Sequence, residues 1–156
     1  MENPVIVFAL RHADRKPAPE DDLSPAGIDR AELLARMLAE SGIRTAYCSD
    51  AVRTQLTVRP LAKLLGAKLE VVVVATDGAG GVEGHVQQIV DRIKALPGDA
   101  VAAVVGHSNT IGPIIKGLTG RTIDPIEDHE FDKLFVVSVP AGGDSSLAPL
   151  RYGQAT

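Results

Sequence analysis

Three short stretches of the sequence carry basic or imidazole side chains at or shortly after the end of a segment that we expect to be a strand. Arg11 and His12 follow the run VIVFAL. Arg53 comes shortly after TAYCS, and His107 follows AVAAVVG. Guanidinium groups bind phosphate oxygens through paired hydrogen bonds, and a neutral imidazole can act as a nucleophile. If these side chains meet in space, they form a site for a compact anion, most simply phosphate.

Each of these residues has an ordinary structural explanation when it is taken alone. An Arg-His pair is common in solvated loops, His107 could be a buried histidine bonded to backbone, and Arg53 could be an exposed helix residue paired with Asp50. The joint pattern is more informative, because every member lies near the end of an apolar run. The other two histidines, His85 and His129, lack this context, and we expect both at the surface.

Continuous apolar runs alternate with helical patterns along the chain. Such runs are typical of strands buried on both faces of a parallel sheet. We expect strands at 5–10, 45–49, 69–75, 100–105 and 131–140, and an edge strand within 145–152. We expect helices at 25–41, 51–66, 82–96 and 110–120. Ser24 as N-cap and Pro25 begin the first helix, and Gly42 is its expected stop. Pro60 should kink or interrupt the second helix.

This alternation predicts an α/β fold, with residues 1–156 forming a single domain. The expected architecture is a three-layer sandwich, a mostly parallel central sheet flanked by helices. Ligands of such sheets bind beyond the carboxyl ends of the strands. The four basic groups named above should converge there, next to helix N-termini that favour anions.

The overall composition excludes several classes of function. The net charge of -4 argues against a broad nucleic-acid or anionic-membrane surface. A single cysteine, Cys48, cannot form an internal disulfide, and no apolar run reaches the roughly 18 residues that span a membrane. The N-terminal residues lack a secretory signal pattern, so we expect a cytoplasmic protein. No dense set of carboxylates, cysteines and histidines has metal-ligand spacing, so we expect no metal.

Four segments, in this order, resemble the signature of the histidine phosphatase superfamily, the phosphoglycerate-mutase-like enzymes. LRHADR is similar to the family's Arg-His-Gly or Arg-His-Ala motif, and LSPAGIDRAELLARML to its Leu-Ser/Thr-x-x-Gly segment and following helix. YCSDAVRTQLTVRPLA is similar to the Ser-x-x-x-Arg-Thr-x-x-Thr stretch, and VVGHSNT to the second-histidine motif. The short length of the chain and the residues of its RHADR and GHSNT motifs resemble those of the small phosphohistidine-phosphatase-like branch.

This resemblance implies a phosphoglycerate-mutase-like fold and a phosphatase that uses no metal or cofactor. His12 would attack phosphorus and form a phosphohistidine that water hydrolyses, with its other ring nitrogen held by a backbone acceptor. Arg11, Arg53 and His107 would bind the phosphoryl oxygens, and Ser108 belongs to the same phosphate-binding set. The expected partner is a small phosphorylated substrate or a phosphohistidine protein, with no nucleic acid and no membrane.

The sequence departs from the family pattern at two points. Ala13 stands at a position where many members have glycine, and Ser108 stands where the acid-phosphatase branch has an aspartate that donates the proton. Asp14 is our preferred replacement for this proton donor, and Glu83 is the alternative. A missing strong acid favours substrates whose leaving group needs little protonation, such as phosphohistidine, acyl phosphates or anhydrides.

Two other functions are compatible with parts of the sequence. One is a dinucleotide site at Gly78, Gly80 and Gly84, although the fingerprint G-x-G-x-x-G would need its third glycine at Glu83. The other is a module that binds a phosphorylated partner through the same four basic groups without turnover. We expect the loops around the site of the four basic groups, at 16–22, 76–84 and 120–129, to determine its specificity.

Overall fold

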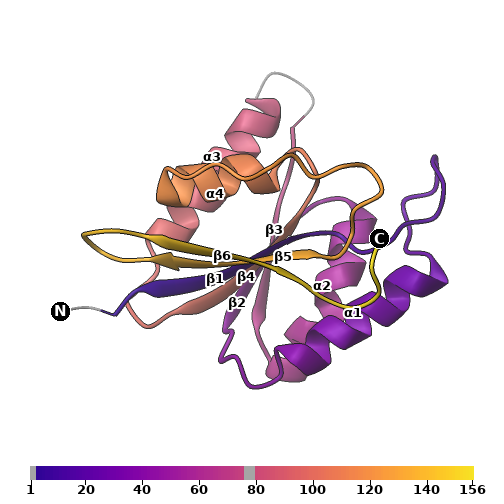
Figure 1. Cartoon of the computed structure of the whole chain (residues 1–156), viewed down its shortest axis with the longest axis horizontal. Helices are drawn as coiled ribbons and strands as arrows, with labels where there is room; N and C mark the ends of the chain where they lie inside the picture. Colours follow the sequence, from indigo (N-terminus) through magenta and orange to yellow (C-terminus); the bar gives the residue numbers. More distant parts are fainter. Residues whose placement is uncertain (1–2, 76–79) are drawn as a thin grey trace.

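Residues 3–75 and 80–156, which the computed structural model describes, fold into a six-stranded sheet covered by helices on both faces (Figure 1). In chain order the elements are β1 (Val5–Arg11), α1 (Pro25–Met37), β2 (Thr45–Ser49), α2 (Val52–Leu65), β3 (Lys68–Val72), α3 (Gly81–Lys94), β4 (Val101–Gly106), α4 (Ile111–Thr119), β5 (Lys133–Val139) and β6 (Ser146–Arg151). The strands lie in the order β3-β2-β4-β1-β5-β6. β1, β2, β3 and β4 pair in parallel, and β5 and β6 are antiparallel to their neighbours. The predicted three-layer α/β sandwich with a mostly parallel sheet is confirmed.

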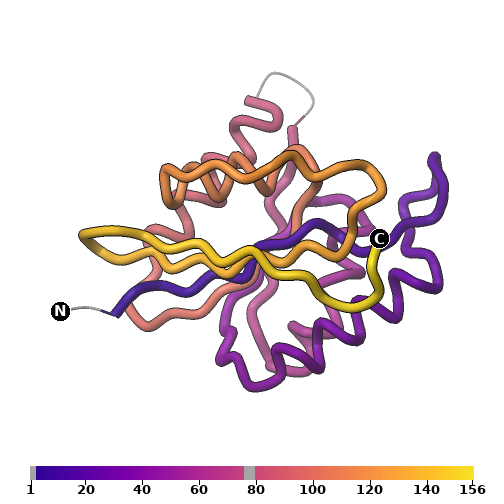
Figure 2. The backbone as a smooth tube through the Cα atoms, in the orientation of Figure 1, coloured from indigo at the N-terminus to yellow at the C-terminus, as the bar shows by residue number. Residues whose placement is uncertain are grey.

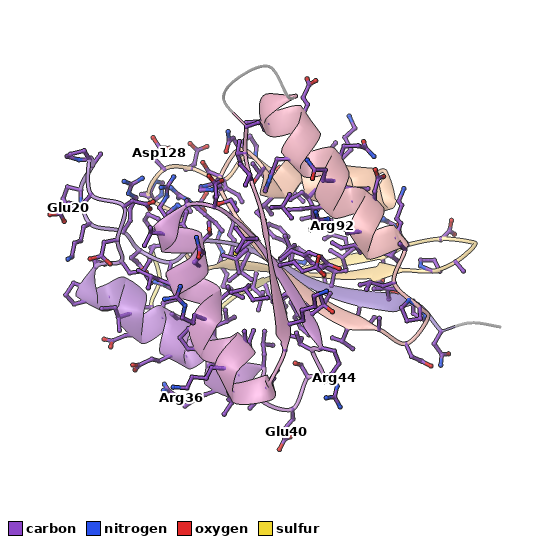
Figure 3. The ribbon with its side chains drawn as sticks, turned by 180° about the vertical axis from the view of Figure 1, so that it is seen from behind. Glu20, Arg36, Glu40, Arg44, Arg92 and Asp128 are labelled. Atoms are coloured by element: carbon purple, nitrogen blue, oxygen red, sulfur yellow. The ribbon has the colours of Figure 1, made fainter. Side chains whose placement is uncertain are left out.

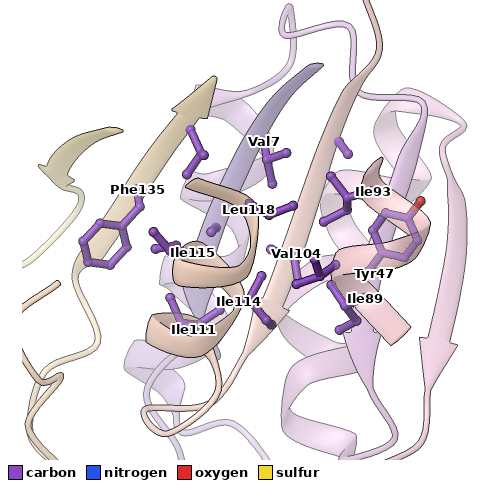
Figure 4. Packing of buried hydrophobic residues seen from close by; sticks show 14 of the residues in the cluster. Val7, Tyr47, Ile89, Ile93, Val104, Ile111, Ile114, Ile115, Leu118 and Phe135 are labelled. Carbon is purple, nitrogen blue, oxygen red and sulfur yellow. The ribbon is translucent and has the colours of Figure 1, made fainter. Parts of the chain in front are cut away.

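The two faces of the sheet bury separate hydrophobic clusters. On one face, α3 and α4 pack Ile89, Ile93 and Ile114 against Val7 of β1 and Val104 of β4 (Figure 4). On the other face, α1 and α2 cover the residues of opposite parity in the same strands. Successive side chains of a strand point to opposite faces, so a continuous apolar run serves both clusters.

The first two helices differ in part from the boundaries expected from sequence. The hydroxyl of Ser24 accepts a hydrogen bond from the backbone N–H of Gly27 and Pro25 opens the helix, so the predicted start of α1 is confirmed. The predicted stop at Gly42 is wrong, because α1 ends at Met37 and Gly42 adopts a positive φ in the turn before β2. Pro60 was expected to kink or interrupt the second helix, and the interruption does not occur. α2 continues through Pro60 to Leu65, since burial of its apolar face against the sheet outweighs the one backbone hydrogen bond that proline cannot make.

β3 is an edge strand and is shorter than expected. It ends at Val72, and Val71 and Val73 are exposed. The prediction of burial on both faces is wrong here, because the helices cover this edge of the sheet only in part. Within the part of the chain that the structure describes, no helix is long and apolar enough to cross a membrane.

Two loops and the C-terminus gather at the same end of the molecule. The segment after β1 and the segment between α4 and β5 both run to this end, where the chain also terminates (Figure 2). Glu20 of the first segment and Asp128 of the second mark it in the opposite view (Figure 3). This is the end at which the parallel strands finish.

Candidate active site

The strand register brings the predicted site residues to one edge of the sheet. Arg11, the last residue of β1, is paired with Gly106, the last residue of β4. The backbone N–H of His12 donates to the carbonyl of Gly106 at 2.8 Å, and His107 follows immediately. The rings of His12 and His107 therefore lie 5.5 Å apart, edge to face. The ends of β1 and β4 thus bring His12 and His107 together, as expected from the sequence.

His12 is held as a neutral imidazole with one defined tautomer. Its Nδ1 lies 2.8 Å from the carbonyl oxygen of Ala13, which can only accept, so Nδ1 carries the proton. Its Nε2, which makes no hydrogen bond with a described residue, therefore keeps a free lone pair. Burial, together with the nearby charges of Arg11 and Arg53, lowers the pKa of His12 to about 3. This is the neutral state that a nucleophile needs, with its other nitrogen on a backbone acceptor as expected.

His107 belongs to a directional chain of hydrogen bonds. Its Nδ1 lies 3.3 Å from Nη2 of Arg53, a group that can only donate. Its Nε2 therefore carries the proton and donates to the hydroxyl of Ser49 at 2.8 Å. Ser49 in turn lies 2.9 Å from the hydroxyl of Thr54. Burial and the positive charge of Arg53 lower the pKa of His107 to about 4.

Arg11 is fixed through one arm of its guanidinium. Its Nη1 donates to the backbone carbonyls of Glu127, Asp128 and Glu130 at 2.9–3.1 Å. The ring of Phe131 lies 4.2 Å from its Cζ. Burial lowers the pKa of Arg11 from its usual value, although arginine stays charged at any ordinary pH. The loop at 120–129, expected to govern specificity, thus helps to position the Arg11 side chain.

Arg53 is fixed in a comparable way by a carboxylate. Its Nη1 lies 2.9 Å from Oδ1 of Asp21, and its Nη2 faces His107. The alternative pairing with Asp50 does not occur, because Asp50 accepts a hydrogen bond from the backbone N–H of Val74 instead. Both arginines therefore use Nη1 for the protein framework, and Nη2 of Arg53 faces His107.

Neither proton-donor candidate makes a hydrogen bond with the two histidines or the two arginines described above. The Oδ1 of Asp14 accepts a 2.7 Å hydrogen bond from Nε of Arg30, and only 16 % of the Asp14 side chain is exposed. Arg30 also donates to the carbonyls of Tyr152 and Gln154, so this pair ties the segment after His12 to the C-terminus. Glu83 is exposed in the first turn of α3.

Two further sequence expectations concern residues near the site. Ser108 lies in the turn between His107 and α4 and is half-buried, and its side chain makes no hydrogen bond with a described residue. Gly78 of the glycine-rich segment lies outside the described residues, while Gly80 and Gly84 are in close contact at the start of α3.

His85 and His129 were both expected at the surface, and the structure agrees only for His129. The prediction that His85 lies at the surface is wrong, because only 1 % of it is exposed. It lies four residues before Ile89 and eight before Ile93, and this spacing puts all three on the buried face of α3. Burial lowers the pKa of His85. His129 is exposed, as expected.

Several residues of the site were not selected from the sequence. Ser49, Thr54 and Thr57 lie within the YCSDAVRTQLTVRPLA segment, so the motif itself was the available signal. Asp21 and Phe131 had no such signal, because their contacts join segments far apart in the chain. Among residues 3–75 and 80–156, no group of three or more histidine, cysteine, aspartate and glutamate side chains could hold a metal ion.

Comparison with protein-family models identifies one family. The model described as histidine phosphatase superfamily (branch 1) matches residues 11–76. The matched region begins at Arg11 and includes His12 and Arg53, whereas His107 lies beyond it. The resemblance predicted from the sequence motifs is confirmed by this match. No protein of curated function matches the chain.

Comparison with solved structures extends the likeness to the whole fold. A protein assigned as the phosphohistidine phosphatase SixA from Nakamurella multipartitia is 25 % identical, with a TM-score of 0.61 over 87 % of this chain and 85 % of that one. The protein histidine phosphatase SixA in complex with tungstate is 20 % identical, with a TM-score of 0.69 over 94 % and 96 %. The phosphoglycerate mutase from Plasmodium falciparum is 15 % identical, with a TM-score of 0.62 over 99 % and 98 %. The expected phosphoglycerate-mutase-like fold is confirmed.

Proposed function

We propose that this chain, which matches the histidine phosphatase superfamily in sequence and has the fold of its members, is a phosphatase that works through a phosphohistidine on His12. The family match and the SixA neighbours support phosphatase activity in general. The observation that carries the mechanism is the hydrogen bond from Nδ1 of His12 to the Ala13 carbonyl. It leaves Nε2 as a neutral nucleophile beside two arginines and a second histidine.

The reaction has two steps at the same phosphorus atom. First, the lone pair of His12 Nε2 forms a bond to phosphorus, and the leaving group departs with the electrons of the bond that breaks. Next, a water oxygen attacks phosphorus, and the electrons of the nitrogen–phosphorus bond return to Nε2. The water protons pass to the product phosphate and to solvent. Both steps are in-line displacements, in which positioning and charge stabilisation provide most of the catalysis.

The remaining basic groups would bind the equatorial oxygens. Arg11 and Arg53 are already anchored through Nη1, so each can present Nη2 to the phosphoryl group without losing its position. His107 is neutral at neutral pH, since its pKa is lowered to about 4. A phosphate dianion beside it favours the imidazolium form, whose Nδ1–H then donates to a phosphoryl oxygen while Nε2–H stays on Ser49. Ser108, next to His107, would complete this set.

The environment of the carboxylates limits the substrate. Asp14 would have to leave Arg30 before its carboxyl group could act on a leaving group, because its Oδ1 is held by a 2.7 Å hydrogen bond from Nε of Arg30. We therefore revise the role of Asp14 from proton donor to structural partner of Arg30. Without a positioned acid, the best substrates have leaving groups that depart readily, such as phosphohistidine in a protein or an acyl phosphate.

A substrate panel with phosphoenzyme trapping tests this proposal. Wild type should hydrolyse a chromogenic aryl phosphate and a phosphohistidine peptide, and it should form an acid-labile phosphoenzyme. His12→Ala should abolish both, and the control His129→Ala, at an exposed histidine outside the site, should retain both. An acid-stable adduct, or one that persists in His12→Ala, contradicts the mechanism. Phosphate binding without turnover would indicate the non-catalytic binding module instead.

The same panel tests the substrate class and the proton donor. Phosphohistidine peptide should be turned over faster than a sugar phosphate, and the reverse order would contradict the proposed class. Asp14→Asn and Glu83→Gln should retain most of the activity on aryl phosphate. A loss of about a hundredfold or more in either variant would identify that carboxylate as the general acid.

A further inference from the structure

The loop between β1 and α1 is braced so that it projects a carboxylate toward α2. Arg15 and Leu23 form an antiparallel bridge at its base. Inside the loop, the backbone N–H of Lys16 donates to the Asp22 carbonyl at 3.0 Å, and the Lys16 ammonium pairs with the Asp22 carboxylate at 2.7 Å. These contacts hold the ends of the loop together. They leave Asp21, the preceding residue, to point away toward another element.

Asp21 caps the N-terminus of α2 from outside that helix. Its Oδ2 accepts from the backbone N–H of Val52 at 2.7 Å, and its Oδ1 accepts from that of Arg53 at 3.0 Å. The N-cap residue of α2 itself is Ala51, which has no side-chain acceptor. A helix N-terminus needs such acceptors for its free N–H groups, so Asp21 provides what the local sequence lacks.

The same carboxylate also binds the side chain of Arg53. The Oδ1 of Asp21 lies 2.9 Å from Nη1, and the other arm of the guanidinium, Nη2, lies 3.3 Å from Nδ1 of His107. A free arginine side chain samples many rotamers, and a charge-assisted bond to one arm fixes the plane of the whole guanidinium. The fixed arm thus determines where the other arm lies relative to His12 and His107.

We infer that Asp21 is a positioning residue for phosphoryl binding, which acts by orienting Arg53 and takes no part in the chemistry. This inference rests on the proposed function, because it assumes that Arg53 binds the phosphoryl group. The carboxylate could instead compete with the substrate for Arg53 and inhibit the enzyme. The geometry favours positioning, since Asp21 occupies Nη1 and the backbone N–H groups, whereas Nη2 faces the histidines.

Binding of inorganic tungstate, measured by calorimetry, tests the inference without turnover. Asp21→Asn keeps an oxygen acceptor for the helix but loses the charged partner of Arg53, and we expect about tenfold to hundredfold weaker tungstate binding. Glu20→Gln is the matched control, with the same charge change one residue before, where the carboxylate is exposed and makes no hydrogen bond with a described residue. It should bind tungstate as wild type does. Equal or tighter binding by Asp21→Asn would overturn the inference, and tighter binding would identify an inhibitory carboxylate.

A double-mutant cycle separates positioning from a role in stability alone. If Asp21 acts through Arg53, then Asp21→Asn should weaken tungstate binding in wild type but have little further effect in Arg53→Ala. An equal loss in both backgrounds would contradict the inference. Asp21→Ser, which can still cap one N–H group, serves if the asparagine variant unfolds.

Failure of His12→Ala to abolish turnover would refute the proposed function alone, because tungstate binding does not depend on the nucleophile's chemistry.

Discussion

The hydroxyl of Thr57 joins helix α2 to the turn that follows His12. Its Oγ1 accepts a 2.9 Å hydrogen bond from the backbone N–H of Ala13 and donates at 2.8 Å to the carbonyl of Arg53. Thr57 is completely buried. One side chain therefore connects the backbone beside His12 to the backbone of the arginine that we propose binds phosphate.

Thr57→Val should damage both stability and catalysis. It leaves the buried N–H of Ala13 without an acceptor, which costs about 1–3 kcal/mol in the free energy of unfolding. The turn that holds His12 is also loosened, so kcat on aryl phosphate should fall. Thr57→Ser retains the hydroxyl and is the control, expected to keep most of kcat. Urea unfolding and steady-state kinetics of the two variants would check this, and equal behaviour of the two would contradict it.

Stability should decrease as the pH is lowered through the range in which free histidine gains a proton. Folded-state pKa values of about 3 for His12 and about 4 for His107 lie below the ordinary value. Between those values and about pH 6.5, the unfolded chain binds more protons than the folded one, so the free energy of unfolding falls. Each such histidine contributes about 1.4 kcal/mol per pH unit in that range.

Comparison of variants isolates this effect from that of the carboxylates. His12→Gln cannot titrate, so the difference in its free energy of unfolding between about pH 7.5 and about pH 5 should be smaller than in wild type. Urea unfolding at the two pH values measures the difference. An equal dependence on pH in both proteins would mean that His12 is protonated as readily in the folded chain as in the unfolded one.

Binding of an oxyanion should be accompanied by proton uptake at His107. Nδ1 of His107 accepts from Arg53 and the pKa of His107 is lowered, whereas an adjacent dianion favours the charged imidazole. Calorimetric titration with tungstate near pH 6, in buffers of different ionisation enthalpy, measures the protons taken up. Wild type should take up a fraction of a proton that is lost in His107→Gln. No dependence on buffer would contradict the proposed donor role.

Gly27 allows α1 to approach the segment that follows His12. A Cβ on Gly27 would collide with the backbone carbonyl of Asp14, which cannot move as a flexible side chain could. Gly27→Ala should therefore cost about 1–3 kcal/mol in stability and displace the turn after His12, with loss of kcat. Gly112→Ala in α4 is the matched control, because its Cβ would meet only ordinary contacts at 3.6 Å. Thermal unfolding and kinetics should separate the two variants.

The ring of Phe131 should contribute to anion binding through Arg11. It lies over the Arg11 guanidinium at 4.2 Å and 5.9 Å from the ring of His12. Phe131→Ala removes this cation–π contact, and we expect tungstate binding to weaken by about 2- to 30-fold. Phe131→Trp, which retains an aromatic face, should bind nearly as wild type does. Equal losses in both variants would show that the ring face is not what matters.

The sequence by itself determined the alternation of strands and helices and the groups at the strand ends. Continuous apolar runs and the Ser24–Pro25 start follow from local rules of burial and capping, and they predicted the layered α/β fold. Parallel strands finish at a common edge, so Arg11, His12 and His107 could be grouped in advance. His85 was misassigned although its spacing from Ile89 on the helix face was readable.

Only the tertiary structure decided how each of these groups is held. Asp21 reaches Arg53 from a different loop, and Arg30 holds the carboxylate of Asp14 by an ion pair across 16 positions. Pairings of this kind depend on the directions in which two loops leave the sheet, and neither periodicity nor composition encodes those directions. The edge position of β3 and the continuity of α2 through Pro60 were likewise decided by packing against neighbouring elements. Local sequence thus specifies which groups are present, and contacts between distant segments decide which of them are free to react.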